Sequence, residues 1–363
     1  MPRLILDAHL DLAMNALHYD RDQTQTVDEI NTREKGMTDS AAREGACVSL
    51  PEMRRGGMAV CLATCLARAK PDVRPLSGHT RISIDWACQD MAYALAQAHV
   101  AYYHVLESQG ELTQIRTRGE LDAHWQRWEE GSDQTLPVGY ILAMEGADPI
   151  VTPDQVEHWW EAGLRSVILA HYGHGMYADG TGATGGLTPR GRELVVELDR
   201  VGMILDLTHS TDRSFAESME LFSGPVMASH TNCRAVVPGD RQFTDDQVRA
   251  LAERDAVIGV SFDAWMLRSG WVIGESTTDG MTLDVVVDQI DYICQLLGNS
   301  DHVAIGSDLD GGFGAEQRPE DLISIADEQK IAPILSDRGY TEAQIDAIFY
   351  GNWLRFFRRT LPA

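Results

Sequence analysis

Short apolar runs recur along the whole chain and are separated by longer segments with helical periodicity. The runs are continuous stretches of Val, Ile, Leu and Ala rather than alternations of apolar and polar residues. This pattern is typical of strands that are covered on both faces in a parallel sheet. It predicts eight strands, at residues 4–6, 58–63, 138–144, 165–170, 203–207, 225–229, 256–262 and 302–307.

Helical patterns fill most of the intervals between these strands. They lie at 80–107, 117–129, 153–162, 282–297, 319–335 and 341–358, and Thr188 followed by Pro189 marks a further helix start. Residues 12–57 are polar and weakly periodic, and the glycines within 173–186 predict a loop. Eight strand–helix units favour a closed (β/α)8 TIM barrel over an open doubly wound sheet. The sequence contains no dinucleotide-binding glycine motif. No linker divides the chain, so we expect a single domain over 1–363.

The amino-acid composition disfavours some classes of binding partner. The 363 residues are 44% hydrophobic and carry 55 acidic against 30 basic side chains, a formal charge of −25. Such a surface repels phosphate, so we expect neither nucleic acid nor membrane as a partner. We see no signal peptide and no apolar segment approaching 18 residues. The six cysteines lack metal-site spacing and predict buried free thiols in a cytoplasmic protein.

Ionisable side chains follow six of the eight predicted strands. In a (β/α)8 barrel these positions converge on the carboxyl-terminal mouth, where the active sites of this fold lie. Each residue alone has a structural explanation, such as a helix cap or a satisfied core histidine, but their common placement favours one site. The residues are His9, Asp11, Glu145, His171, His209, His230 and Asp308.

The chemistry of this set favours metal binding. His9 and Asp11 share one face of an extended segment, and imidazole with carboxylate suits zinc or a similar divalent metal. Three imidazoles, an Asp and a Glu exceed the needs of one tetrahedral zinc. A carboxylate between two half-sites can instead bridge two cations ~3.5–4 Å apart, whose shared water would have a pKa near ~7. Asp308 would take its proton and return it to a leaving amine.

These segments resemble the renal (membrane) dipeptidase family, and specifically its soluble bacterial members. The resemblance spans nearly the whole chain in order. It rests on Asp-Ala-His-Leu-Asp at 7–11, Glu-Gly at 145–146, Leu-Ala-His at 169–171, Gly-Leu-Thr-Pro-Arg-Gly at 186–191, Met-Ile-Leu-Asp-Leu-Thr-His at 203–209, Ala-Ser-His-Thr-Asn at 228–232, Ile-Gly-Ser-Asp-Leu-Asp-Gly at 305–311 and Gly-Asn-Trp-Leu-Arg at 351–355. It implies a zinc-dependent dipeptidase on a (β/α)8 barrel of the metal-dependent hydrolase type, typically a homodimer.

The resemblance also implies roles for individual residues. His9 and Asp11 would bind one zinc, His209 and His230 the other, and Glu145 would bridge them. His171 would contact the substrate carbonyl and stabilise the oxyanion, and Asp308 would shuttle the proton. Arg241 would bind the terminal carboxylate of a dipeptide, possible substrates including L-D dipeptides.

Some segments depart from the family pattern. Leu10 stands between the two first ligands, Gly-His-Gly-Met-Tyr occupies 173–177, and Ser-Phe-Asp occupies 261–263. The predicted metal ligands are all present, whereas the loops that would contact substrate differ. The side-chain preference is therefore left open.

Two other functions remain as alternatives. A metal-dependent amidohydrolase would act on a non-peptide amide or a lactone, but such enzymes commonly carry His-x-His on the first strand and a bridging lysine. Here the motif is His-x-Asp, and no lysine ends a strand. A non-catalytic binder with a retained metal site is the second alternative, and the complete ligand set together with Asp308 disfavours it.

Overall fold

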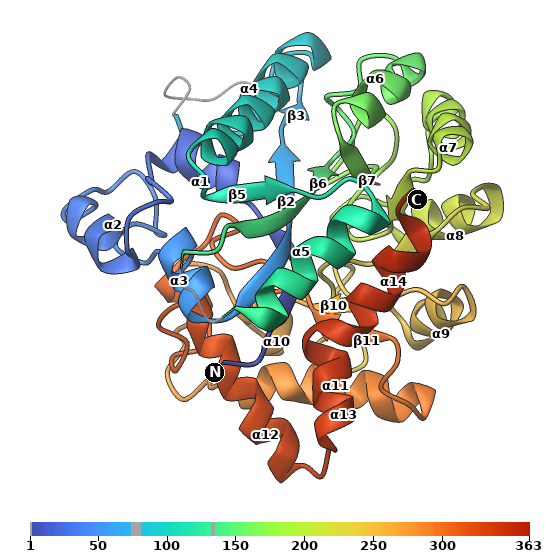
Figure 1. Ribbon diagram of the computed structural model, residues 1–363. Coiled ribbons are helices and arrows are strands. Elements are labelled where there is room, and N and C mark those ends of the chain that lie inside the picture. The colour runs from blue at the N-terminus through green and yellow to red at the C-terminus, as the bar shows by residue number, and fades with distance from the viewer. Residues whose placement is uncertain (1, 74–80, 132–134) are drawn as a thin grey trace.

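The computed structural model describes residues 2–73, 81–131 and 135–363 and shows a barrel of parallel strands surrounded by helices (Figure 1). Within these residues the barrel has eight strands, as the sequence predicts. They are β1 (Ile5–Leu10), β2 (Met58–Leu66), β6 (Val138–Glu145), β7 (Leu164–Ile168), β8 (Ile204–Asp206), β9 (Val226–Met227), β10 (Ile258–Val260) and β11 (Val303–Ile305).

Parallel ladders join most neighbouring strands. One sheet runs β1-β2-β6-β7-β8-β9, and β10 pairs with β11. A parallel bridge between Ala228 and Ile258 connects the two sheets. Between β11 and β1 a side chain makes the link, because Asp7 Oδ1 accepts a hydrogen bond of 2.9 Å from the Ser307 amide. The barrel therefore closes through a buried carboxylate.

Helices cover the outside of the barrel. The α-helices are α1 (Leu12–Tyr19), α2 (Val27–Arg33), α3 (Leu50–Arg55), α4 (Gln89–Ser108), α5 (Arg118–Glu130), α6 (Val156–Glu161), α7 (Pro189–Val201), α8 (Asp212–Leu221), α9 (Asp245–Glu253), α10 (Ala264–Leu267), α11 (Asp284–Leu297), α12 (Ile331–Asp337), α13 (Glu342–Asp346) and α14 (Asn352–Thr360). Short 3₁₀ segments lie at Pro153–Gln155, Ala315–Gln317 and Ile325–Lys330, and a short π-helix lies at Ala347–Gly351.

Several expectations need correction. The segment 12–57 holds three helices rather than an irregular excursion. The helix expected at 80–107 begins only at Gln89, because Asp85–Trp86 forms a short strand, β4, beside β3 (Arg68–Ala69); residue 80 lies outside the described residues. A further strand, β5 (Leu112–Gln114), pairs with the start of β6.

The predicted cap of α7 is confirmed. Thr188 Oγ1 accepts a hydrogen bond of 3.0 Å from the Gly191 amide, and Pro189 opens the helix. All six cysteines are free, as expected, but Cys88 is exposed. No helix among the described residues combines the length and the apolar character needed to cross a bilayer.

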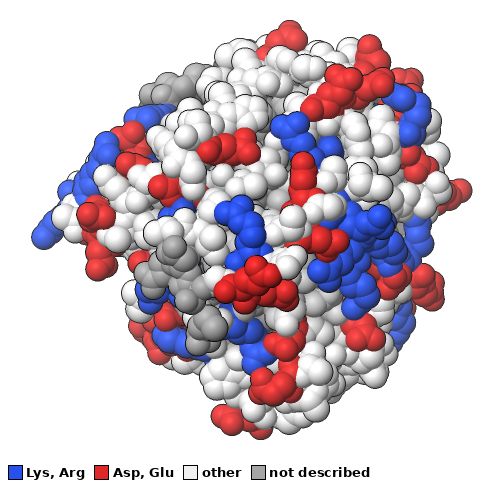
Figure 2. Space-filling view, in the orientation of Figure 1, with Lys and Arg blue, Asp and Glu red and all other residues white. Residues whose placement is uncertain are grey.

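The carboxyl-terminal Asn-Trp pair fastens α14 to the barrel. Asn352 Nδ2 donates to the carbonyls of Ser300 and Val303, and Trp353 Nε1 donates to the carbonyl of Ile305. These bonds satisfy backbone oxygens around β11, which gives this motif a structural role. Figure 2 shows a group of basic side chains among acidic ones on the face that carries α14, so the net negative charge is not spread evenly there.

Candidate metal centre

Glu145 lies at the centre of the histidines predicted to bind metal, and its two oxygens face different partners. Oε1 is 3.2 Å from His209 Nε2 and 3.3 Å from His230 Nε2, and these two nitrogens are 3.2 Å apart. Oε2 is 3.4 Å from His9 Nε2. Tetrahedral ligands of zinc, at 2.0–2.1 Å from the ion, are separated by roughly 3.3 Å. The triangle at Oε1 therefore has the dimensions of a metal site.

A second group lies on the Oε2 side. His9, Asp11 and Asp308 bring one ligand atom each to within 4.8 Å of one another. Asp11 Oδ1 accepts a hydrogen bond from the Thr64 hydroxyl, which orients the carboxylate. His9 Nε2 is buried and has no hydrogen-bond partner among the described residues. A buried nitrogen without a partner is costly, and a divalent cation would satisfy it. The residues thus fit a two-cation centre.

The charges of the cluster also favour cations. Burial disfavours a charge on His9, but the carboxylates of Glu145, Asp11 and Asp308 outweigh it and raise the pKa of His9 to about 10. Burial, together with these neighbouring carboxylates, raises the pKa of Asp11 and of Asp308. Two buried carboxylates and the partly buried Asp308 therefore draw positive charge strongly into one small volume.

The histidines on the Oε1 side are suited to be neutral ligands. Burial lowers the pKa of His209 and of His230 well below the ordinary value. His209 Nδ1 lies 3.0 Å from the Thr181 hydroxyl and His230 Nδ1 lies 2.9 Å from the Ser229 hydroxyl. A hydroxyl can accept Nδ1–H, which leaves the lone pair of Nε2 free for a cation.

The local backbone turns sharply where these side chains enter the site. His209 has a φ of 65° and Asp308 a φ of 60°, both in the left-handed region that non-glycine residues rarely adopt. Such conformations persist where the surrounding structure enforces them, and they cluster at functional sites.

His171 joins the cluster at its edge. Its Nε2 is 3.6 Å from Glu145 Oε1, and burial lowers its pKa to about 3, with Arg68 and Arg241 acting in the same direction against Glu145. The distances alone would admit His171 as a ligand together with Glu145 and His209.

Arg241 is almost completely buried beside the cluster. Its Nη2 donates a hydrogen bond of 2.8 Å to the carbonyl of His230, whereas Nη1 has no partner among the described residues. A buried guanidinium with a free donor is a receptor for an anion such as a carboxylate. The structure thus brings together all eight residues that the sequence singles out.

Sequence reasoning missed the side chains that orient the site. Thr64, Thr181 and Ser229 hold Asp11, His209 and His230, and Arg68 holds His171. A hydroxyl directly before a ligand, as Ser229 precedes His230, is a usable sequence signal. The other three residues lie far from their partners along the chain and carry none.

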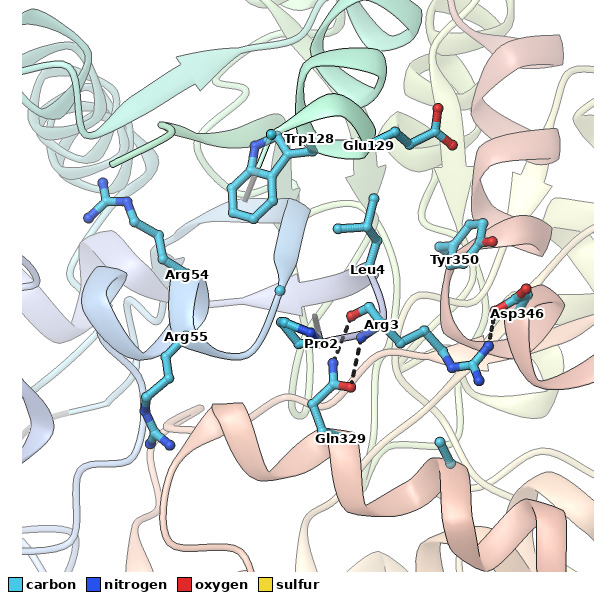
Figure 3. A pocket seen from close by; sticks show the side chains of 13 residues that line it. Pro2, Arg3, Leu4, Arg54, Arg55, Trp128, Glu129, Gln329, Asp346 and Tyr350 are labelled. Carbon is cyan, nitrogen blue, oxygen red and sulfur yellow. Dashed lines mark hydrogen bonds and ion pairs between the residues drawn. The ribbon is translucent and has the colours of Figure 1, made fainter. Parts of the chain in front are cut away.

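A separate cavity lies away from this cluster. It has a volume of about 700 Å³ and is lined by residues around the start of β1 and β2, including Arg3, Arg54 and Trp128 (Figure 3). Since the metal cluster lies at the other ends of these strands, this cavity is not the site. In it Arg3 bonds to Asp346 and Gln329.

A parallel eight-stranded barrel with a histidine–carboxylate cluster at its mouth is typical of metal-dependent hydrolases. The sequence profile of the membrane dipeptidase family (peptidase family M19) matches residues 3–361, so the chain belongs to that family. The expected family and barrel are thereby confirmed, and with them an enzyme of the metallopeptidase class.

The individual proteins that the chain matches include named dipeptidases and solved structures of M19 metallopeptidases. Dipeptidase aclJ of Aspergillus oryzae is 30% identical over 60% of this chain and 50% of its own length. The chain spans about half the length of several curated dipeptidases that it matches. The crystal structure of dipeptidase AC, an M19 metallopeptidase, superimposes with a TM-score of 0.78 at 23% identity, covering 100% of both chains. A metallopeptidase of Rhodobacter sphaeroides bound to a phosphinate mimic of L-Ala-D-Ala has a TM-score of 0.76 at 23% identity, covering 99% of this chain and 100% of that one.

Proposed function

We propose that this chain hydrolyses the peptide bond of dipeptides at a centre of two divalent cations, zinc by its ligand set. The observation that carries the proposal is the position of Glu145, whose two oxygens face separate groups of ligands. His9 and Asp11 would hold one cation, and His209 and His230 the other. When bound, such a pair would polarise the substrate carbonyl and lower the pKa of a water molecule.

The remaining polar residues would handle the substrate. Arg241 would bind the carboxylate of the dipeptide through its free Nη1. His171 would donate a hydrogen bond to the carbonyl oxygen as negative charge develops there. Asp308, whose raised pKa favours proton uptake, would accept a proton and transfer it to the departing amine.

Substrate stereochemistry is the finer part of the proposal. We include L-D dipeptides among the substrates, since the similar Rhodobacter sphaeroides structure holds a mimic of L-Ala-D-Ala. The single domain over 1–363, the homodimer and the cytoplasmic location stay predictions. Gel filtration with light scattering tests the homodimer.

The decisive experiment combines metal analysis with a substrate screen. Protein loaded with zinc and then desalted should retain about two ions per chain and cleave L-L or L-D dipeptides faster than amino-acid amides or lactones. His209→Ala should lose at least one ion and nearly all activity. His104→Ala, at an exposed position of α4, is the matched control and should retain both.

Each contrary outcome has a definite meaning. One ion or none per chain in the wild-type protein would overturn the bridged centre. Cleavage of lactones in preference to dipeptides would favour the amidohydrolase alternative. Two bound ions with no hydrolysis of any substrate would favour the non-catalytic binder.

A further inference from the structure

Arg68 contacts the imidazole of His171 from a segment that carries no predicted site residue. It belongs to β3, directly after β2 leaves the barrel. Arg68 Nη1 lies 3.2 Å from His171 Nδ1, and Arg68 Nε donates to Asp85 Oδ1 at 2.6 Å. The guanidinium is thus held between a carboxylate on β4 and a histidine on the rim of the metal cluster.

This contact determines which nitrogen of His171 carries the proton. A guanidinium only donates hydrogen bonds, so Nδ1 must accept one with its lone pair. The single proton of the neutral imidazole then resides on Nε2, the nitrogen that faces Glu145. His171 therefore presents an N–H group, not a lone pair, to the centre of the site.

His209 and His230 have partners that permit the opposite arrangement. Thr181 Oγ1, which also donates to the carbonyl of His209, can accept a hydrogen bond from His209 Nδ1–H. Ser229 can do the same for His230. Hydroxyl partners are compatible with metal-binding nitrogens, whereas an arginine partner is not. The partner of Nδ1 thus separates ligands from a hydrogen-bond donor within one cluster.

The segment that carries Arg68 is firmly tied to the loop that carries His171. Lys70 Nζ donates to the carbonyls of Tyr172 and His174. Asp148 accepts from the Ala69 amide at 2.8 Å and from the Met176 amide at 2.9 Å. These bonds, made by the two residues that follow Arg68, fix its distance from the imidazole.

We propose that Arg68 is a positioning residue that holds His171 in the Nε2–H tautomer for dipeptide hydrolysis. The proposal rests on the proposed function. The Nε2–H group donates to the carbonyl oxygen of the substrate as charge accumulates there, and without Arg68 the imidazole is free to rotate or change tautomer. Arg68→Met should lower kcat roughly 10-fold to 100-fold with little change in KM, a range typical of residues that orient an active-site group.

The first test reads the tautomer directly. Zinc-loaded protein labelled with ¹⁵N-histidine is compared in the wild-type, Arg68→Met and Arg68→Lys forms, and His171→Gln identifies the resonance. We expect an Nε2–H pattern with an accepting Nδ1 in the wild type and an altered pattern in Arg68→Met. Arg68→Lys keeps a donor at this position and should recover most of the tautomer signal and of kcat.

The control variant removes an arginine that does not contact the ring or the loop of His171. Arg200→Met, at an exposed position of α7 where Arg200 pairs with Glu197 and Glu157, should leave the His171 tautomer unchanged, and all variants should retain the zinc content of the wild type. An unchanged tautomer in Arg68→Met, or an unchanged kcat, would overturn the role of Arg68. Absence of dipeptide hydrolysis in the wild type would instead refute the proposed function, and the tautomer measurement still reports on the Arg68 contact.

Discussion

The chemistry of each histidine in this site depends on the atom that meets its second nitrogen. Thr181 and Ser229 let His209 and His230 offer lone pairs, whereas Arg68 makes His171 a donor. Sequence alone shows histidines at strand ends in all these cases. Their roles therefore differ through the side chain that meets Nδ1, which is the preceding residue for His230 and a residue of another segment for His209 and His171.

Asp308 gives a test of proton transfer at the scale of one residue. Asp308→Asn keeps the shape and tolerates the φ of 60°, because asparagine adopts left-handed backbone readily. The amide can neither accept nor return the proton, so kcat on a dipeptide should fall roughly 10²-fold to 10⁴-fold. Steady-state kinetics measures the loss. The zinc content and the melting temperature should match the wild type, and a kcat within twofold of the wild type would remove Asp308 from the mechanism.

At the scale of elements, two glycines allow the backbone near β10 and β11 to pack closely against the carbonyl group of Ser229, which follows β9. A Cβ atom at Gly306 would lie 1.8 Å from the Ser229 oxygen, and one at Gly259 would lie 1.9 Å from it. Strands β10 and β11 therefore approach β9 closely only because these positions lack side chains. Ser229 directly precedes His230, so this packing also places a metal ligand.

Gly306→Ala should disturb both the fold and the site. Forcing a methyl group against backbone that cannot move freely should lower the free energy of unfolding by roughly 3 kcal/mol and weaken zinc binding. Urea unfolding and zinc titration measure the two effects. Gly119→Ala, at an exposed helical position with open space around it, is the control and should stabilise the protein by up to about 1 kcal/mol. Equal stability of Gly306→Ala and wild type would contradict this account.

The sequence predicts the elements whose pattern is local and misses those that depend on distant partners. All eight barrel strands and the cap at Thr188 follow from apolar runs and helix-start signals. The strand β5 has only three residues, two of them polar, so it forms only because the start of β6 offers free backbone groups for pairing. Arg68 resembles any arginine after a strand, and its partner lies 103 residues away. The roles of the site residues stay predictions.

At the scale of the whole molecule, closure of the barrel depends on buried acids. Asp7 is fully buried in β1 and accepts hydrogen bonds from the amides of His9 and Ser307. Glu328, in the 3₁₀ segment Ile325–Lys330, is also fully buried, and neither of its carboxyl oxygens has a hydrogen-bond partner among the described residues. Burial, and then the charge of Asp7, raise the pKa of Glu328 well above 4.5.

This raised pKa makes stability depend on pH in a defined direction. The folded protein holds a proton on Glu328 over a range in which the unfolded chain has released it. The contribution to stability is therefore complete below pH 4.5, the ordinary pKa, and is lost as pH rises toward the pKa of the folded state. One such group changes the free energy of unfolding by at most about 1.4 kcal/mol per pH unit.

Glu328→Gln should remove this dependence because the amide carries no proton to lose. Relative to wild type, the variant should gain stability progressively as the pH rises above 4.5 in urea unfolding experiments on zinc-loaded protein. Contributions of the metal centre are common to both proteins, so the difference between the two curves isolates Glu328. The exposed Glu253→Gln controls for loss of one carboxylate. Parallel curves for wild type and Glu328→Gln would show that Glu328 does not hold a proton in the folded barrel.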